Sequence, residues 1–292
     1  DTVLVGSVGA TPDDVESLTA AVLETPGFEL VGVCTEGAST DQPEYAPAPC
    51  YADYHVMLED PAMELVVVEG PVDKRRDFAV RALNAGRHVL CALPFAETAA
   101  DAVRIMKTAF NEELVATAFL PWRNEPAFAA ARAAVDQADL RPLDELFINR
   151  PCDAGHWEES LLAVLDQANL LVRTDFASVS IHTGDSAFLY LPLRDESAVT
   201  ARIGPADGLS LPAYAFSGRG TRAHTNDGAT RLTRTGTAQT VAAPEPIDFW
   251  ENLYWAIRSR AEVACHPVDI VRAMRLAESA REAVQTGRPA TV

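Results

Sequence analysis

Two stretches of the chain combine residue types that could bind a phosphate or move a proton. The first is the run Gly6–Thr11, which follows an apolar segment and has glycines at Gly6 and Gly9. Its spacing suggests the G-x-G-x-x-G turn that receives a pyrophosphate in dinucleotide-binding folds. Aligned on Gly6, the run places Val8 and Thr11 at the second and third glycine positions. Since the second glycine normally lets the backbone approach the pyrophosphate, Val8 is expected to obstruct it.

The residues after this run weaken the phosphate interpretation further. A helix that starts here has Thr11 as its N-cap, Pro12 as its first residue and two carboxylates, Asp13 and Asp14, in its first turn. These carboxylates occupy the positive helix end that otherwise attracts a phosphate. The sequence therefore predicts a self-capped helix in place of a strong phosphate site.

The second stretch is the polar loop 151–159, which contains Cys152 and His156 and precedes a predicted helix from Trp157 to Val172. An imidazole exchanges protons near neutral pH, so His156 could act as a general acid or base. The alternative is a polar surface loop that Trp157 anchors, and the sequence favours this alternative.

Charge and cysteine usage exclude several classes of protein. The chain of 292 residues has 24 Lys and Arg against 42 Asp and Glu, a net charge of −18, which disfavours nucleic acid and anionic membranes as partners. No apolar run is long enough for a membrane span. There is no C-x-x-C pair, so we expect no zinc or other metal site and no disulfide framework. Without disulfides, a reducing, cytoplasmic compartment is the expected location. The five cysteines are Cys34, Cys50, Cys91, Cys152 and Cys265.

The first part of the chain, residues 1–120, alternates apolar runs with helical patterns. Because the runs are apolar throughout, they are typical of strands covered on both faces. The pattern predicts an α/β fold: a doubly wound parallel sheet of the Rossmann type. The predicted strands are Thr2–Gly6, Phe28–Cys34, Glu64–Val68, Arg87–Cys91 and Leu114–Phe119.

The remainder, residues 121–292, predicts an α+β domain with a mostly antiparallel sheet of about five strands. Helices are expected over Pro126–Gln137, from Trp157 to Val172 and from Val268 to Thr286. One face of the sheet carries apolar residues, either Leu189, Leu191 and Leu193 or the residues that alternate with them along the strand. A large apolar face usually marks an interface, so we expect a homodimer or a higher homo-oligomer.

One segment resembles a known family. The stretch Val66–Glu69, the pair Gly70-Pro71 and the run Ala82–Pro94, with Ala-Gly-Arg-His-Val-Leu-Cys at its centre, are similar to the Gfo/Idh/MocA oxidoreductases. This resemblance implies a Rossmann domain that binds NAD or NADP and a second domain that shapes a pocket for a small-molecule ligand such as a sugar or cyclitol. The cofactor-binding positions that it implies are Gly6, Ser7, Val8, Gly9, Glu36, Gly70 and Pro71.

The chain departs from the family at the positions that carry its chemistry. Where the family has the lysine of E-K-P, this sequence has Leu93. Where the family has the histidine of D-x-x-x-H, it retains Asp166 but places Leu170. Neither leucine can donate a hydrogen bond or transfer a proton. Catalytic candidates are therefore reduced to Asp166 and His156.

Some side chains near the expected cofactor turn have two interpretations. Glu36 could hold the adenosine ribose of NAD, or it is a solvated loop residue. Arg75 and Arg76 could meet a phosphate, although solvation is favoured. The leading hypothesis is a family member with a ligand-binding or assembly role in place of standard dehydrogenase chemistry. The alternatives are an active, divergent NAD(P)-dependent oxidoreductase and a non-redox enzyme that reuses the pocket.

Overall fold

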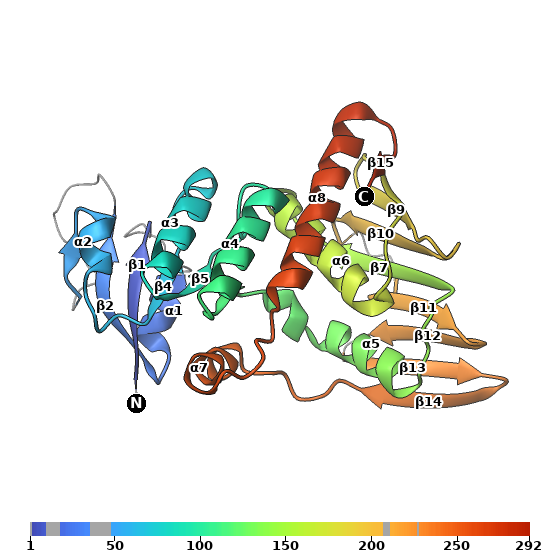
Figure 1. Cartoon of the computed structure of the whole chain (residues 1–292). Helices are drawn as coiled ribbons and strands as arrows, with labels where there is room; N and C mark the ends of the chain where they lie inside the picture. Colours follow the sequence, from blue (N-terminus) through green and yellow to red (C-terminus); the bar gives the residue numbers. More distant parts are fainter. Residues whose placement is uncertain (1, 10–17, 36–47, 207–210, 227) are drawn as a thin grey trace. The chain divides into compact units, whose positions relative to one another are not determined.

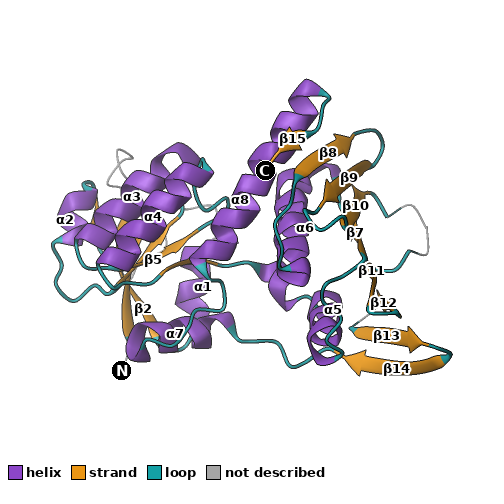
Figure 2. Cartoon of the chain, turned by 45° about the vertical axis from the view of Figure 1, so that its right-hand side comes forward, coloured by secondary structure: helices purple, strands orange, loops and turns teal. Residues whose placement is uncertain are grey.

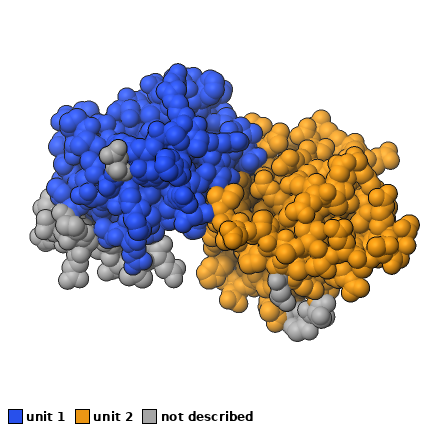
Figure 3. Space-filling model, turned by 90° about the horizontal axis from the view of Figure 1, so that it is seen from below, with its two compact units in different colours: residues 1–119, 248–271 blue, residues 120–247, 272–292 orange. Residues whose placement is uncertain are grey.

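The computed structural model describes residues 2–9, 18–35, 48–206, 211–226 and 228–292. The chain divides into two compact units, which Figure 3 shows in different colours. The first comprises residues 1–119 and 248–271, and the second comprises residues 120–247 and 272–292. Among the described residues, no helix is both long and apolar enough to span a lipid bilayer.

The first unit is built on a parallel sheet, as predicted. Within the described residues it has six strands in the order β3-β2-β1-β4-β5-β6 (Figure 1). All of its pairings are parallel, which confirms the doubly wound α/β class. The strands are β1 (Val3–Val8), β2 (Phe28–Cys34), β3 (Cys50–Tyr51), β4 (Leu65–Val68), β5 (His88–Cys91) and β6 (Ala116–Ala118).

The helices of this unit follow from local signals in the sequence. The Thr98 side chain accepts the N–H of Asp101 and so caps the start of α4, as the Thr98-x-x-Asp101 spacing predicts. Helices α3 and α4 lie side by side in both views (Figures 1 and 2). The described helices of the unit's first segment are α1 (Leu18–Glu24), α2 (Tyr54–Leu58), α3 (Val72–Asn84) and α4 (Ala99–Asn111).

A late segment of the chain also belongs to the first unit. It contains α7 (Phe249–Ser259), whose Arg258 forms an ion pair with Glu64 before β4 and donates to the carbonyl of Thr2. The hydroxyl of Thr117 in β6 donates to the carbonyl of Cys265. The sequence pattern assigned these late residues to a second domain over 121–292, because the pattern contains no sign that the chain returns.

The second unit is built on a larger sheet than the sequence predicted. In the part of the chain that the structure describes, the sheet has nine strands, in the order β14-β13-β12-β11-β7-β10-β9-β8-β15. Its pairings are antiparallel except for β7 with β10, which is parallel. The strands are β7 (Glu145–Pro151), β8 (Ser178–His182), β9 (Ala187–Pro192), β10 (Ala198–Gly204), β11 (Tyr214–Gly218), β12 (Thr221–Asn226), β13 (Ala229–Arg234), β14 (Thr237–Ala242) and β15 (Ala290–Thr291).

One face of this sheet is packed on helices and the other is open. Leu189, Leu191 and Leu193 are buried in the core together with residues of α6 (Trp157–Val172). Their alternates Phe188 and Tyr190 point the other way and are about half exposed, at 51% and 50%. The unit also contains α5 (Pro126–Gln137), the short 3-10 helices η1 (Pro121–Asn124) and η2 (Ala154–His156), and most of α8 (Pro267–Thr286), from residue 272 onwards.

Candidate functional site

The carboxyl end of β1 is the place where a dinucleotide turn is expected. Gly6, Ser7 and Val8 lie inside β1 and pair with β2, and Ser7 and Val8 are fully buried. The turn begins only at Gly9, which has a φ of +81°. The turn that the sequence analysis placed at Gly6 is therefore part of the strand. When the turn is counted from Gly9, its second and third glycine positions lie outside the described residues.

Gly9 packs against Gly70, the residue that follows Glu69 at the end of β4. A Cβ added at Gly9 would lie 2.3 Å from the Cα and the nitrogen of Gly70. Two turns at neighbouring strand ends therefore meet backbone to backbone, which only glycine allows at this φ. Pro71 then precedes the first residue of α3. Gly9, Gly70 and Pro71 are thus the described residues of the implied cofactor set that lie at strand ends.

A side chain that the sequence analysis did not select fills this end of the sheet. The carboxylate of Glu69 accepts the N–H groups of Leu18, at 2.7 Å, and Thr19, at 3.2 Å, the first described residues of α1. It also accepts the hydroxyl of Thr19, which is 2.6 Å from the hydroxyl of Ser7. The start of α1 as described is therefore occupied by a negative charge from the protein itself.

Arg75 and Arg76, in the first turns of α3, are both engaged. Arg75 Nε donates to the carbonyls of Glu69 and Gly70, and Arg75 Nη1 donates to those of Ala92 and Pro94. It therefore joins the segments that follow β4 and β5. Arg76 forms an ion pair with Asp101 of α4 at 2.9 Å. The expectation that both arginines are simply solvated is wrong.

Asp166 lies in the interior of the second unit, on α6. Its carboxylate accepts Trp122 Nε1 at 2.8 Å, Arg123 Nε at 2.9 Å and Arg123 Nη2 at 2.7 Å. The residue is 0% exposed. Two charge-assisted hydrogen bonds from Arg123 and one from the indole of Trp122 thus pair this carboxylate with groups of the protein itself.

His156 lies at the other end of the same helix, as the N-cap of α6, and is exposed. At a rise of about 1.5 Å per residue, it is roughly 15 Å along the axis from Asp166. The structure does not bring these two catalytic candidates together. Cys152 Sγ donates to the neighbouring carbonyl of Asp153.

The remaining predicted positions can be placed individually. Leu93 is half-buried after β5 in the first unit, and Leu170 is 7% exposed on α6 in the second. Glu36 and the predicted Thr11–Asp14 helix start lie outside the described residues. No group of three His, Cys, Asp or Glu side chains suited to a metal occurs in the described ranges.

Comparison with known proteins places the first part of the chain beside one family. Residues 2–119 match the model of the Gfo/Idh/MocA oxidoreductase family, which has an NAD-binding Rossmann fold. The sheet at its core, with parallel strands and the β1 turn described above, is the fold that this family model describes.

Individual relatives are distant. Inositol 2-dehydrogenase of Salmonella typhimurium is 28% identical over 189 residues, 59% of this chain and 55% of that protein. The uncharacterized oxidoreductase YhhX of Escherichia coli is 32% identical over 105 residues, 34% of this chain and 30% of that protein. The chain thus spans about half the length, or less, of these curated relatives.

The solved structures show the same fold over the whole chain. An NAD-binding protein from Listeria innocua superimposes with a TM-score of 0.76 at 18% identity, covering 100% of this chain and 97% of that one. Both units therefore have counterparts in a known architecture.

Two side chains of the site have weak signals in the sequence. Glu69 is an acidic residue directly after the buried run Val66–Val68, which is an unusual end for an apolar strand. Arg123 follows Trp122 without any pattern that links it to Asp166, which lies 43 positions later. Only the first of them could have been selected from the sequence.

Proposed function

We propose that this chain is a Gfo/Idh/MocA-type protein that does not carry out standard nicotinamide-dependent dehydrogenation and instead serves by binding a small molecule or by assembly. The observation that carries this proposal is the carboxylate of Glu69 on the amides of Leu18 and Thr19. Those amides are donors of the kind that helix starts offer to phosphates. The described part of the turn therefore does not fit a pyrophosphate.

Electrostatics support the same conclusion. A pyrophosphate placed about 5 Å from the Glu69 carboxylate would be repelled by roughly 2 kcal/mol at an effective dielectric constant near 60. Expelling the carboxylate would also leave the Thr19 hydroxyl, which the Ser7 hydroxyl contacts, without its acceptor. Both costs oppose binding of NAD or NADP.

The catalytic positions point in the same direction. By resemblance, Leu93 and Leu170 stand where the family has its lysine and histidine, and general acid–base groups typically supply about 10²–10⁴-fold in rate. Asp166 is committed to Arg123 and Trp122. No described side chain at these positions is free to accept the proton of a substrate hydroxyl.

Calorimetry tests the nucleotide part of the proposal. We expect NAD and NADP to bind the unmodified protein more weakly than about 1 mM, which corresponds to −4.1 kcal/mol. Glu69→Ala, which removes the charge, should bind either nucleotide more tightly than the unmodified protein. The control is Glu97→Ala, at an exposed site of the same unit, which should leave the affinity for both nucleotides unchanged. Micromolar binding of NAD or NADP to the unmodified protein contradicts the proposal.

The second candidate is an active, divergent NAD(P)-dependent oxidoreductase. It is supported by the family match and by the name of the Salmonella relative, inositol 2-dehydrogenase. Its test is oxidation of myo-inositol, other cyclitols and sugars with NAD or NADP. Turnover that is abolished by His156→Ala and survives Leu93→Ala would establish this candidate and exclude the first.

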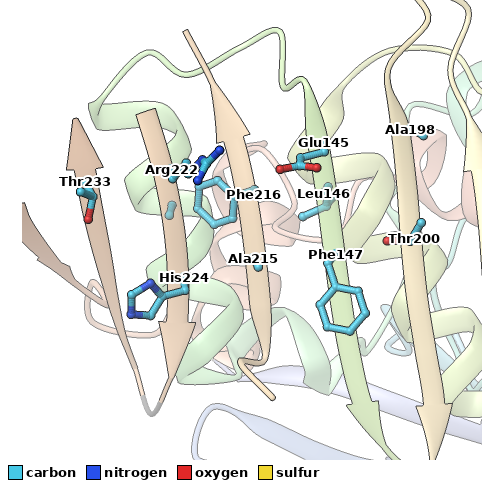
Figure 4. Close-up of a pocket in the computed structure, with 11 residues that line it drawn as sticks. Glu145, Leu146, Phe147, Ala198, Thr200, Ala215, Phe216, Arg222, His224 and Thr233 are labelled. Carbon is cyan, nitrogen blue, oxygen red and sulfur yellow. The ribbon is translucent and has the colours of Figure 1, made fainter. Parts of the chain in front are cut away.

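The open face of the larger sheet supports the assembly role. A row of side chains crosses this face in register, from Tyr190 through Thr200, Phe147 and Ala215 to His224. Figure 4 shows four of them, Phe147, Thr200, Ala215 and His224, around a shallow hollow of about 690 Å³. Aromatic groups on a flat face favour pairing with a second copy of the same face.

A further inference from the structure

A pocket in the second unit gathers positive charge in a strongly acidic protein. It measures about 300 Å³ and is lined by α6, the segment after it, the turn between β9 and β10, and α8. Its polar lining residues are Asn169, Thr174, Asp175, Arg194, Arg272 and Arg275. It uses no residue of the nucleotide turn in the first unit, so its test does not depend on whether NAD or NADP binds there.

The three arginines of this pocket are free to bind a ligand. Arg194, Arg272 and Arg275 are exposed, and within the described chain their side chains form no ion pair or hydrogen bond. Arg272 and Arg275 lie three positions apart on α8, so they occupy the same face of the helix. The one acidic side chain of the lining is Asp175, which leaves a local excess of positive charge.

The floor of the pocket offers a polar group that the protein does not use. Asn169 is 5% exposed and lines the pocket, yet its side chain has no hydrogen-bond partner among the described residues. A side-chain amide offers two donors and an acceptor, so Asn169 can hydrogen-bond a molecule that enters the pocket. It thus adds neutral polar groups to the arginines of the lining.

Arginine and carboxylate side chains together indicate the chemistry of that molecule. Guanidinium groups bind phosphate or carboxylate oxygens through paired, charge-assisted hydrogen bonds. Asp175 can only accept hydrogen bonds when ionised, so it requires a donor such as a hydroxyl. We propose that this pocket binds a small organic anion that also carries hydroxyl groups, such as a sugar phosphate or a sugar acid.

Calorimetry with defined probes tests the proposal. The probes are D-glucose 6-phosphate, D-gluconate, inorganic phosphate and D-glucose. We expect saturable binding of glucose 6-phosphate or gluconate with a Kd below about 1 mM, and weaker binding of phosphate or glucose alone. Which of the two anions binds more tightly distinguishes a phosphate ligand from a carboxylate ligand.

Three variants locate the binding. The double variant Arg272→Gln with Arg275→Gln should weaken binding of the anion at least about tenfold, since charge-assisted hydrogen bonds are lost. Asn169→Asp keeps the shape of the side chain but introduces a negative charge, and it should weaken binding of the anion to a similar extent. Arg231→Gln lowers the net charge by one, as Asn169→Asp does, on the exposed side of β13 away from the pocket, and should leave binding within about twofold.

Several results would overturn the site. These are no saturable binding of either anion, equal affinity for glucose and the anions, or equal weakening by Arg231→Gln and the double variant. Thermal melts of each variant accompany the titrations. Because Arg272 and Arg275 are exposed, we expect the double variant to fold as the unmodified protein does.

Discussion

Arg123 and Asp166 form a buried, bidentate ion pair in the second unit. Their side chains are 7% and 1% exposed, and the Arg123 Nη2 atom lies 2.7 Å from Asp166 Oδ1. The pair joins η1, at the start of the unit, to the middle of α6. An aspartate whose family position implies chemistry at a substrate therefore holds two elements of the second unit together.

Neutralising this aspartate should cost stability. Asp166→Asn removes the negative charge opposite a buried guanidinium, and breaking such pairs typically costs about 3–5 kcal/mol. Denaturant titration of the free energy of unfolding measures the effect. The control is Asp139→Asn, which breaks the exposed pair with Arg219 and should cost less than about 1 kcal/mol. Equal, small effects in both variants would show that the buried pair is not structural.

Removing the carboxylate of Glu69 should loosen the start of α1. Glu69→Ala deletes the acceptor of two backbone N–H groups and of the Thr19 hydroxyl. By analogy with the loss of helix caps, we expect a decrease of about 1–2 kcal/mol in the free energy of unfolding. Hydrogen exchange at the amides of Leu18 and Thr19 should accelerate in this variant and not in Glu97→Ala. Unchanged exchange in Glu69→Ala would show that the carboxylate does not hold these amides.

His88 makes stability depend on pH. Its Nδ1 accepts the N–H of Val115 at 2.9 Å, which requires an unprotonated nitrogen. Burial lowers the pKa of His88 below its usual 6.5, with smaller opposing effects of Glu64, which raises it, and Arg258, which lowers it. His88 therefore binds a proton more readily in the unfolded chain than in the folded protein. The stabilisation that neutral His88 contributes is complete above pH 6.5 and is lost as the pH falls towards the folded pKa.

The variant His88→Asn isolates this contribution, because its side-chain oxygen can still accept a hydrogen bond but does not titrate. Between pH 7 and pH 5 we expect the unmodified protein to lose up to about 1.4 kcal/mol per pH unit from this group, and the variant to lose less. His224→Asn, at an exposed site on β12, should retain the full dependence. A pH profile that His88→Asn leaves unaltered would exclude His88 as its source.

The open sheet face should mediate self-association. Phe147→Glu places a charge in the middle of the row that crosses this face, and we expect the mass measured by light scattering to fall to that of the single chain. Phe110→Glu is the matched control, since Phe110 is 82% exposed in the first unit. A single-chain mass for the unmodified protein at micromolar concentration would reject the interface.

The sequence predicts best the long helices that begin at a clear start signal. The bounds of α5 and α6 are those that the pattern predicts, since each begins at a clear signal and maintains helical spacing. β8, β12, β14 and β15 were not predicted because they are short, or rich in Thr, Arg and Ser. A polar strand with one exposed face gives little hydrophobic signal.

The site was predictable to a smaller extent. Pattern reasoning located the turn after β1 but placed it inside the strand, because Gly6 precedes Gly9 and strand ends are the least certain bounds. It could not pair Glu69 with Leu18, which is 51 positions away, or Arg123 with Asp166, since such contacts arise only from packing.

The outermost strand of the larger sheet has a consequence for how copies of the chain could join. β14 has no charged residue, its first four residues are exposed, and its outer edge has no strand partner among the described residues. An uncharged free edge is a template on which another chain can add a strand. Joining through this edge would extend the sheet sideways and leave its open face available. Gln239→Lys would place a charge on this edge and oppose such growth, and it would not alter the open face.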